Sequence, residues 1–261
     1  MRRRLWSWVW LATGGVYFLV PLLATFQFSL KATRGTTSLT AYRSVFNSPR
    51  FVESFAFSFR VALATIAVSV LLIVPTAYWV HLRLPRWRPL IESCTLLPFV
   101  VPAVVLVFGL IRTYNRTPLT NSSRGLWVLL IGSYVILSLP YMYRAVDNGL
   151  RAINVATLTE AAQSLGAGWG TIVGQVIFPN VLVAVLSGAF VTFAIVMGEF
   201  TIAFLLAQPA FGPYMNQVSS SKVYEPSALA IISFALTWAS IAVIQFAGRR
   251  VSGQGRRGDV R

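Results

Sequence analysis

The segment that decides the fold reads Glu160-Ala161-Ala162-Gln163-Ser164-Leu165-Gly166, and after nine residues it ends in Val176-Ile177-Phe178-Pro179. It lies between two long apolar runs and is too close to both to form a domain of its own. Its first half has the composition of a helix, and the glycines that follow are expected to interrupt that helix. We therefore predict a short helical element that is exposed at one face of a membrane.

The composition indicates an integral membrane protein. Of the 261 residues, 56% are hydrophobic and only 11% are charged, and the mean hydropathy is +0.68, well outside the range of soluble domains. The formal net charge is +15, but the basic residues form short clusters between apolar runs. Because no basic helix or domain is present to hold a duplex, the charge does not indicate nucleic-acid binding.

Six apolar runs are long enough to cross a bilayer, since about 20 helical residues span about 30 Å of hydrocarbon. The first run is expected to be an uncleaved span, because no convincing cleavage site follows it. In the third run, Pro98 and Pro102 should kink or split the helix. The predicted spans are approximately residues 8–30, 57–80, 92–112, 126–144, 181–206 and 227–247.

The distribution of basic residues orients this arrangement. Six spans place both termini on one side, and thirteen Lys and Arg residues fall on that side against eight on the other. Because positive charge accumulates in cytoplasmic loops, both termini and a coupling loop at about residues 150–175 are expected to be cytoplasmic. The Arg-rich tail from Arg249 to Arg261 is expected to be attracted to anionic membrane lipid.

The sequence lacks the residues that most enzymes of this size would need. It has one cysteine, Cys94, and one histidine, His81, which exclude an intramolecular disulfide and histidine-rich or cysteine-based metal centres. Cys94 has apolar surroundings and is expected to be an inert buried thiol. His81 is expected in an Arg-rich loop, which argues against a Ser-His protease. We predict no catalytic residue, no metal, no cofactor and no phosphate-binding loop, hence a transporter subunit in place of an enzyme.

The pattern Glu-Ala-Ala-x3-Gly-x9-Val-x-Phe-Pro resembles the EAA signature of the inner-membrane permease subunits of binding-protein-dependent ABC importers. That signature usually ends in Ile-x-Leu-Pro, and here Val176 and Phe178 replace Ile and Leu. The resemblance covers about residues 55–250 in span order. It implies an all-α, polytopic permease fold with six transmembrane helices and cytoplasmic coupling helices between spans 4 and 5. The implied partners are an ATPase dimer, a second permease (a heterodimer is favoured) and an extracytoplasmic substrate-binding protein, at a bacterial inner membrane.

Seven residues are predicted to make or shape the contact with the ATPase. Glu160 suits the positive end of the helix dipole and could meet a basic partner residue, or it could be a carboxylate without a partner. Trp169 could fill a groove of the partner, or it could lie at the membrane interface. Pro179 could instead only begin the fifth span. Ala161, Ala162 and Leu165 are expected to share one apolar helix face. The full set of seven is Glu160, Ala161, Ala162, Leu165, Gly166, Trp169 and Pro179.

Glu199 is the one carboxylate predicted well inside a span. A charge at mid-membrane costs roughly 2.5–3.5 kcal/mol, so such a group usually faces a cavity or a partner. Its alternative role is a structural ion pair or hydrogen bond. If the fifth span is one continuous helix, Glu199 shares a face with Thr192 and Ala203. The predicted translocation path consists of Thr192, Ile195, Val196, Glu199 and Phe200.

The cargo is a separate question. The segment Met197-Gly198-Glu199-Phe200-Thr201 is similar to the fifth span of the spermidine/putrescine branch of these permeases, and a carboxylate suits a cationic polyamine. Ferric ion, phosphonate and thiamine are alternative cargoes. A stand-alone channel or secondary transporter is disfavoured because the chain shows no convincing internal repeat and only this one intramembrane carboxylate. A membrane scaffold would need neither Glu199 nor the coupling loop.

Overall fold

The computed structural model describes residues 2–31 and 36–255, and helices make up most of this part of the chain. The prediction of an all-α protein is therefore confirmed. In chain order the elements are α1 (Arg2–Ser29), α2 (Thr40–Phe46), α3 (Pro49–Arg83), η1 (Pro85–Trp87), α4 (Arg88–Thr95), α5 (Leu97–Val100), α6 (Ala103–Tyr114), α7 (Pro118–Asn121), α8 (Ser123–Arg151), α9 (Val155–Ser164), α10 (Trp169–Thr171), η2 (Ile172–Ile177), α11 (Phe178–Gly198), α12 (Thr201–Leu205), α13 (Phe211–Ser221) and α14 (Glu225–Gly255).

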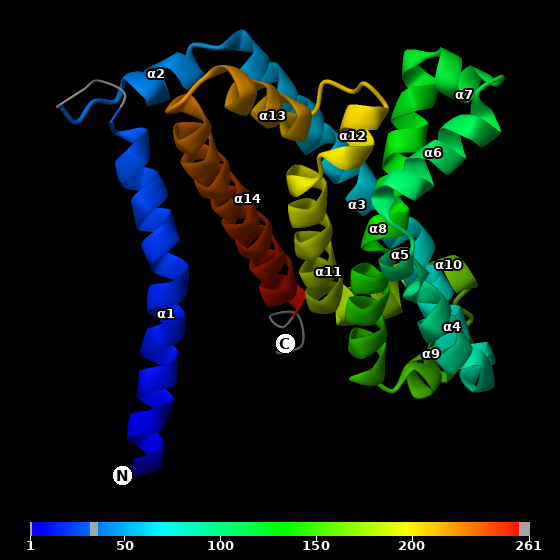
Figure 1. The fold of residues 1–261 in the computed structure, drawn as a ribbon. Coiled ribbons are helices and arrows are strands. Elements are labelled where there is room, and N and C mark those ends of the chain that lie inside the picture. Colours follow the sequence, from blue (N-terminus) through cyan, green and yellow to red (C-terminus); the bar gives the residue numbers. More distant parts are fainter. Residues whose placement is uncertain (1, 32–35, 256–261) are drawn as a thin grey trace.

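The helices α3, α8 and α11 form the centre of the molecule, and α14 packs against α11 (Figure 1). The helix α1 stands apart from this bundle and contacts α14. The short helix α9 lies at one end of the bundle, and α12 and α13 lie at the opposite end. We call these two regions the α9 end and the α13 end. The first turn of α1 and the last turn of α14 both point toward the α9 end (Figure 1).

Several of these helices are long and apolar enough to cross a membrane. Four pass on length and composition, and a fifth span results if two helices joined by a 92° bend count as one. The predicted sixth span coincides with α14, whose side chains beyond Ser240 lie almost entirely outside the described residues. The number of six spans thus stays a prediction. The four helices are Trp6–Ser29, Pro49–Arg83, Ser123–Arg151 and Trp169–Gly198, and the bent pair is Pro85–Val100 with Ala103–Tyr114.

The predicted break in the third span is confirmed. The chain leaves the helix at Val101, which has φ −91° and ψ 112°, and a new helix begins after Pro102. Pro98 lies in the first turn of α5, where its missing N–H is not needed, and Pro102 directly precedes α6, so the chain is interrupted between the two helices. The two halves meet at 92°.

The fifth span does not run as one helix. The helix α11 ends at Gly198, and Glu199 is extended with φ −79° and ψ 130° before α12 begins at Thr201. The prediction of a continuous helix through residue 206 is therefore wrong. Glu199 and Ala203 cannot share a helix face with Thr192, because the break between them changes the direction of the chain.

The helices α8 and α11 approach each other closely at two glycines. A Cβ placed on Gly149 would lie 2.6 Å from Ala184 Cβ, and one on Gly188 would lie 3.2 Å from Ala145 Cβ. Small residues on both helices thus let the two backbones approach closely, as is common in membrane bundles. This contact holds the last turns of α8 in a fixed position relative to α11.

Two further predictions concern Cys94 and the Arg-rich tail. Cys94 is exposed, so the prediction of a buried thiol is wrong. Ser93 and Thr95 flank it in the sequence, so its position in an apolar span did not establish burial, because a span can face lipid as well as protein. The Arg-rich tail falls on residues whose side chains or positions lie outside the described part of the chain.

Candidate coupling surface

The helix α9 is held at both ends by its own sequence. At its start, the Asn154 side chain accepts a hydrogen bond of 3.2 Å from the Thr157 backbone N–H, which satisfies one of the free donors of the first turn. At its end, Gly166 has φ +78°. The Gly166 N–H donates to Gln163 O and the Ala167 N–H donates to Ala162 O, at 2.9 and 3.0 Å. These bonds form a Schellman motif, and the left-handed position explains why glycine stands there.

The outer surface of α9 and its turn is a small apolar projection with one carboxylate. Leu165 is 89% exposed, and Glu160 and Ala161 are exposed as well. Within the part of the chain that the structure describes, Glu160 makes no ion pair. Ala162 is only 6% exposed and belongs to the core. The predicted common face of Ala161, Ala162 and Leu165 is therefore wrong for Ala162, which faces inward.

Trp169 lies beside the last turns of α3. Its ring centroid is 5.3 Å from that of Trp79 and 6.3 Å from that of Tyr78. The Arg83 guanidinium carbon lies 5.8 Å from the Trp79 ring and 6.0 Å from the Trp169 ring, within the range of cation–π attraction. Trp169 is still 40% exposed. One part of the ring thus fixes α10 against α3, and the other part remains available at the surface.

Pro179 lies in the first turn of α11, directly after the π-helical turn η2. Proline lacks a backbone N–H, and the π-helical hydrogen bonding of η2 accommodates the missing donor. The Asn180 side chain donates a 2.7 Å hydrogen bond to Val176 O and satisfies a carbonyl of this irregular turn. Pro179 therefore marks the point where the surface segment joins the long helix.

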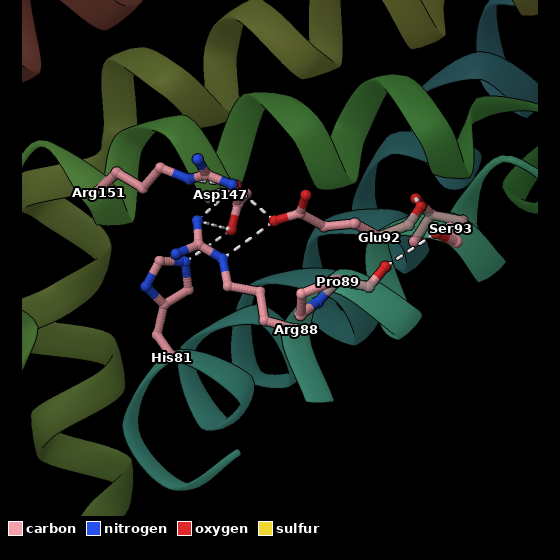
Figure 2. A network of polar contacts seen from close by, with 8 residues as sticks. His81, Arg88, Pro89, Glu92, Ser93, Asp147 and Arg151 are labelled. Atoms are coloured by element: carbon pink, nitrogen blue, oxygen red, sulfur yellow. Dashed lines mark hydrogen bonds and ion pairs between the residues drawn. The ribbon is translucent and has the colours of Figure 1, made fainter. Parts of the chain in front are cut away.

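A cluster of charged side chains lies beneath this surface, and we call it the charged anchor: His81, Arg88, Glu92, Asp147 and Arg151 (Figure 2). Asp147 is its centre and is only 4% exposed. His81 Nε2 lies 2.7 Å from Asp147 Oδ1, Arg88 Nη2 donates to both carboxylate oxygens at 2.8 and 2.9 Å, and Arg151 Nε donates to Oδ2 at 2.8 Å. The buried carboxylate therefore has partners on both oxygens, as a buried charge requires.

Glu92 completes the charged anchor. Its Oε1 accepts a 2.6 Å hydrogen bond from Arg151 Nη2 and lies 3.0 Å from Arg88 Nε, an ion pair without the alignment of a hydrogen bond. Two carboxylates thus meet two guanidinium groups and an imidazole, which come from α3, α4 and α8.

The sequence analysis did not find this cluster. It placed His81 in a loop, whereas His81 is in the last turn of α3 with a side chain that is 10% exposed, so that prediction is wrong. It also ended the fourth span at residue 144, whereas α8 continues to Arg151. A carboxylate at residue 147 with Arg151 one turn later was the available signal, because the pair lies on one helix face.

The residues predicted for the translocation path do not form one surface. Thr192 is fully buried and donates to Gly188 O at 2.9 Å, and Val196 is 2% exposed in the core. Ile195 is half-buried. Phe200 is 36% exposed and stacks on Phe204 with 5.0 Å between the ring centroids.

Glu199 makes structural contacts at the α13 end. Its Oε1 and Oε2 accept from the Ile202 backbone N–H at 2.9 and 3.0 Å. Its Oε2 also accepts from the Tyr134 hydroxyl at 3.1 Å. The carboxylate therefore caps α12 and ties it to α8, which matches the alternative role named for it.

Comparison with known proteins identifies the family. A model of the binding-protein-dependent transport system inner membrane component matches residues 73–252, which is more than half of the chain. The chain belongs to this family. It is thus an inner-membrane transporter subunit and not a catalytic enzyme, as the EAA-like segment predicted.

Two curated relatives are similar over almost their whole length. The molybdenum transport system permease protein ModB of Mycobacterium tuberculosis is 26% identical over 255 residues, which cover 93% of this chain and 94% of ModB. The spermidine/putrescine transport system permease protein PotC of Escherichia coli is 23% identical over 260 residues, with 94% of each chain covered. The two relatives differ in cargo, so the comparison establishes an importer permease and leaves the cargo open.

Solved structures show the same fold. A chain of a bacterial ABC transporter involved in the import of the acidic polysaccharide alginate superposes with a TM-score of 0.69, at 12% identity, over 96% of this chain and 97% of that chain. A chain of the MetNI methionine ABC transporter in an inward-facing conformation gives a TM-score of 0.52 at 19% identity, over 79% of this chain. At these identities the likeness concerns the fold alone.

Proposed function

We propose that the chain is one of two permease subunits of an ATP-driven importer, and that its α9 end is cytoplasmic and binds a separate ATPase. The observation that carries this proposal is the turn at Gly166, which holds an 89% exposed Leu165 on a rigid base. Apolar side chains on a fixed helix end are what a partner's groove binds at low entropic cost. Both termini would then be cytoplasmic.

In this mechanism, hydrolysis takes place on the ATPase and moves α9 and α10. The cargo path forms between this chain and a second permease, for which we favour a different polypeptide. An extracytoplasmic binding protein would deliver cargo at the α13 end. A hollow of about 630 Å³ lies there, lined by charged and amide side chains that include Arg50, Glu53, Gln208 and Gln217.

The substitution Leu165→Asp tests the ATPase contact. It should reduce the ATPase that copurifies with the permease by about tenfold, because the projecting apolar group is replaced by a charge (about 1.4 kcal/mol or more). Val223→Asp is the matched control, since Val223 is 66% exposed in the segment between α13 and α14 and should leave copurification unchanged. Equal copurification with wild type and Leu165→Asp would contradict the proposal, as would full ATP-dependent transport by the purified chain alone.

For the cargo we propose a polyamine, supported by the similarity to PotC and by the carboxylate of Glu199 near the α13 end. Because Glu199 also caps α12, the similarity to PotC is the stronger of these two supports. Molybdate is the rival cargo, supported by the similarity to ModB. Ferric ion, phosphonate and thiamine have no comparable support among these relatives.

Uptake by proteoliposomes separates the two cargoes. The permease pair, its ATPase and its binding protein would be reconstituted and given labelled spermidine or labelled molybdate with ATP. Uptake of spermidine is expected, and Glu199→Gln should slow it because the cap is kept while the charge is removed. Uptake of molybdate alone, or spermidine uptake that Glu199→Gln does not change, would remove the electrostatic argument.

A further inference from the structure

We infer that Asp147 is a positioning residue for coupling: it locks the last turn of α8, and with it α9, to the ends of α3 and α4, so that a displacement of α9 reaches the α13 end through α3. This inference rests on the proposed function, because it assumes that an ATPase moves α9. It names a route that the EAA-like segment does not contain.

The first step is the short link between Asp147 and α9. Asp147 and Arg151 lie on the last two turns of α8, and only residues 152–154 separate α8 from α9. The Ala152 N–H still donates to Asn148 O at 3.2 Å, so the link continues the helix direction for one more residue. A force on α9 therefore acts on the same turns that carry the buried carboxylate.

The second step is the set of contacts between this region and α3. Asp147 holds His81 in the last turn of α3. One turn earlier, the Tyr78 hydroxyl lies 2.9 Å from the Thr159 hydroxyl of α9, and both residues are buried. The ring of Trp169 rests on Tyr78 and Trp79. The last two turns of α3 are thus joined to α8, α9 and α10 at once, which makes independent movement of these elements costly.

The third step is the length of α3. It has 35 residues, which correspond to about 52 Å at 1.5 Å per residue. Near its other end, the Ser58 hydroxyl accepts a 2.8 Å hydrogen bond from the Phe211 backbone N–H of α13, and Ser48, directly before α3, accepts from the Tyr214 hydroxyl at 3.3 Å. Within the described residues, α3 thus connects the charged anchor to the α13 end as one assigned helix, with a single lost backbone hydrogen bond at Pro75.

The alternative route through α11 is less rigid. A displacement can enter α11 where Gly149 of α8 packs against Ala184, but α11 ends at Gly198, and the extended Glu199 separates it from the helices of the α13 end. The charged anchor is also more directional than an apolar contact, because each hydrogen bond fixes an angle as well as a distance. An apolar cluster of the same volume could be as stable, so stability alone does not account for five charged or titratable side chains here.

The experiment uses the intact permease–ATPase complex in nanodiscs. Val52, which is 57% exposed in the first turn of α3, is replaced by cysteine in a Cys94→Ser background, and the rate of its reaction with a membrane-impermeant maleimide is measured without nucleotide and after trapping with ATP and vanadate. In the otherwise wild-type complex the two rates should differ by about fivefold. In Asp147→Asn the difference should disappear while the amount of bound ATPase stays unchanged.

Arg151 provides the second test, which remains valid if Asp147→Asn fails to assemble. The side chain is 50% exposed, so substitution should be tolerated by the fold. Arg151→Gln should reduce the nucleotide-dependent change in reactivity, and Arg151→Lys, which keeps the charge but cannot bridge Asp147 and Glu92 in the same way, should restore part of it. A merely structural role would lower the yield of complex and leave the response of the assembled fraction unchanged.

The outcomes separate the inference from the proposed function. A wild-type response in Asp147→Asn, or in Arg151→Gln if that is the variant that assembles, overturns the inference alone. An otherwise wild-type complex whose residue 52 does not respond to vanadate trapping overturns it too, since no movement then reaches the end of α3. A chain that binds no ATPase at all overturns the proposed function together with the inference.

Discussion

The α9 end and the α13 end are stabilised by different kinds of polar contact. At the α9 end, Asp147 is 4% exposed and joins His81 and Arg88, which lie 66 and 59 residues away in the sequence. At the α13 end, the ion pair is Lys222 with Glu225, three residues apart, with side chains that are 46% and 22% exposed. The ion pairs at the α9 end thus centre on a buried carboxylate with partners from distant helices, whereas the ion pair at the α13 end is local and partly exposed.

This difference indicates which end is built as a single unit. Breaking a buried charge pair leaves an uncompensated charge, whereas an exposed pair loses little against water. The α9 end should thus resist deformation and transmit force, while the α13 end can rearrange at small cost. That division suits a protein that receives force at one end and changes its opening to cargo at the other.

The largest effect should follow the removal of Asp147. Asp147→Ala leaves two arginines and a histidine without their shared carboxylate, and it should lower the free energy of unfolding by about 3–5 kcal/mol. Thermal unfolding of the purified protein in detergent measures this loss. Glu225→Ala is the matched change at the α13 end and should cost less than about 1 kcal/mol. Losses of similar size in both variants would contradict the proposed difference in stability between the α9 end and the α13 end.

The next largest effect concerns the helix contact behind the charged anchor. Gly149→Ala places a Cβ 2.6 Å from Ala184 Cβ, which cannot rotate away, so overpacking should cost about 1–3 kcal/mol. Gly132 is in the same helix, and a Cβ there meets nothing within 4 Å. Gly132→Ala should therefore be neutral or stabilising. If unfolding temperatures fall equally in both variants, the close approach of α8 and α11 does not determine the stability of the α9 end.

A smaller and more local effect should follow substitution of Gly166. Its φ of +78° costs a β-branched residue about 1–2 kcal/mol, and no neighbouring atom adds to this. Gly166→Val should insert normally but lose ATPase activity that depends on the loaded binding protein, because the position of Leu165 changes. Gly166→Asn keeps access to the left-handed region and serves as the control. Unchanged stimulated ATPase activity in Gly166→Val would count against a coupling role for this turn.

The smallest effect concerns acid sensitivity at the α13 end. Burial alone would raise the pKa of Glu225, but its hydrogen bond to Lys222 and the charge of that residue, together with Ser44, lower the pKa below its ordinary value of 4.5. A lowered pKa in the folded state means that the stabilisation is present above pH 4.5 and is lost as the pH falls through the lower value. Glu225→Gln should slightly flatten the decline in unfolding temperature below pH 4.5. A decline identical to wild type would show that this carboxylate does not contribute.

Local features of the chain were predictable from sequence. The apolar runs placed the spans that coincide with the four long apolar helices and the bent pair, and Pro98 and Pro102 predicted the break that the structure shows as a 92° bend. The turn at Gly166 followed from the glycine in the EAA-like segment, because only the local backbone determines a left-handed residue. These features depend on a few neighbouring residues, so the local sequence is sufficient to predict them.

The direction in which side chains point was harder to predict. Ala162 and Leu165 are three residues apart, yet one is buried and the other is 89% exposed. Cys94 lies in a predicted span but is exposed. Hydropathy records that a side chain avoids water, and it does not distinguish burial in protein from contact with lipid. The packing of the bundle decides between the two.

The sequence alone determined a membrane protein with a short helix between two spans, because helix periodicity, span length and turn chemistry are local properties, and the resemblance of the segment at residues 160–179 to the EAA signature predicted a permease. Only the tertiary structure showed what the segment rests on. Asp147, His81 and Arg88 meet because α3 and α8 end, and α4 begins, close to one another, and Glu199 caps α12 because α11 stops one residue earlier. Pairing between distant residues depends on how helices pack, and a sequence pattern does not record that packing.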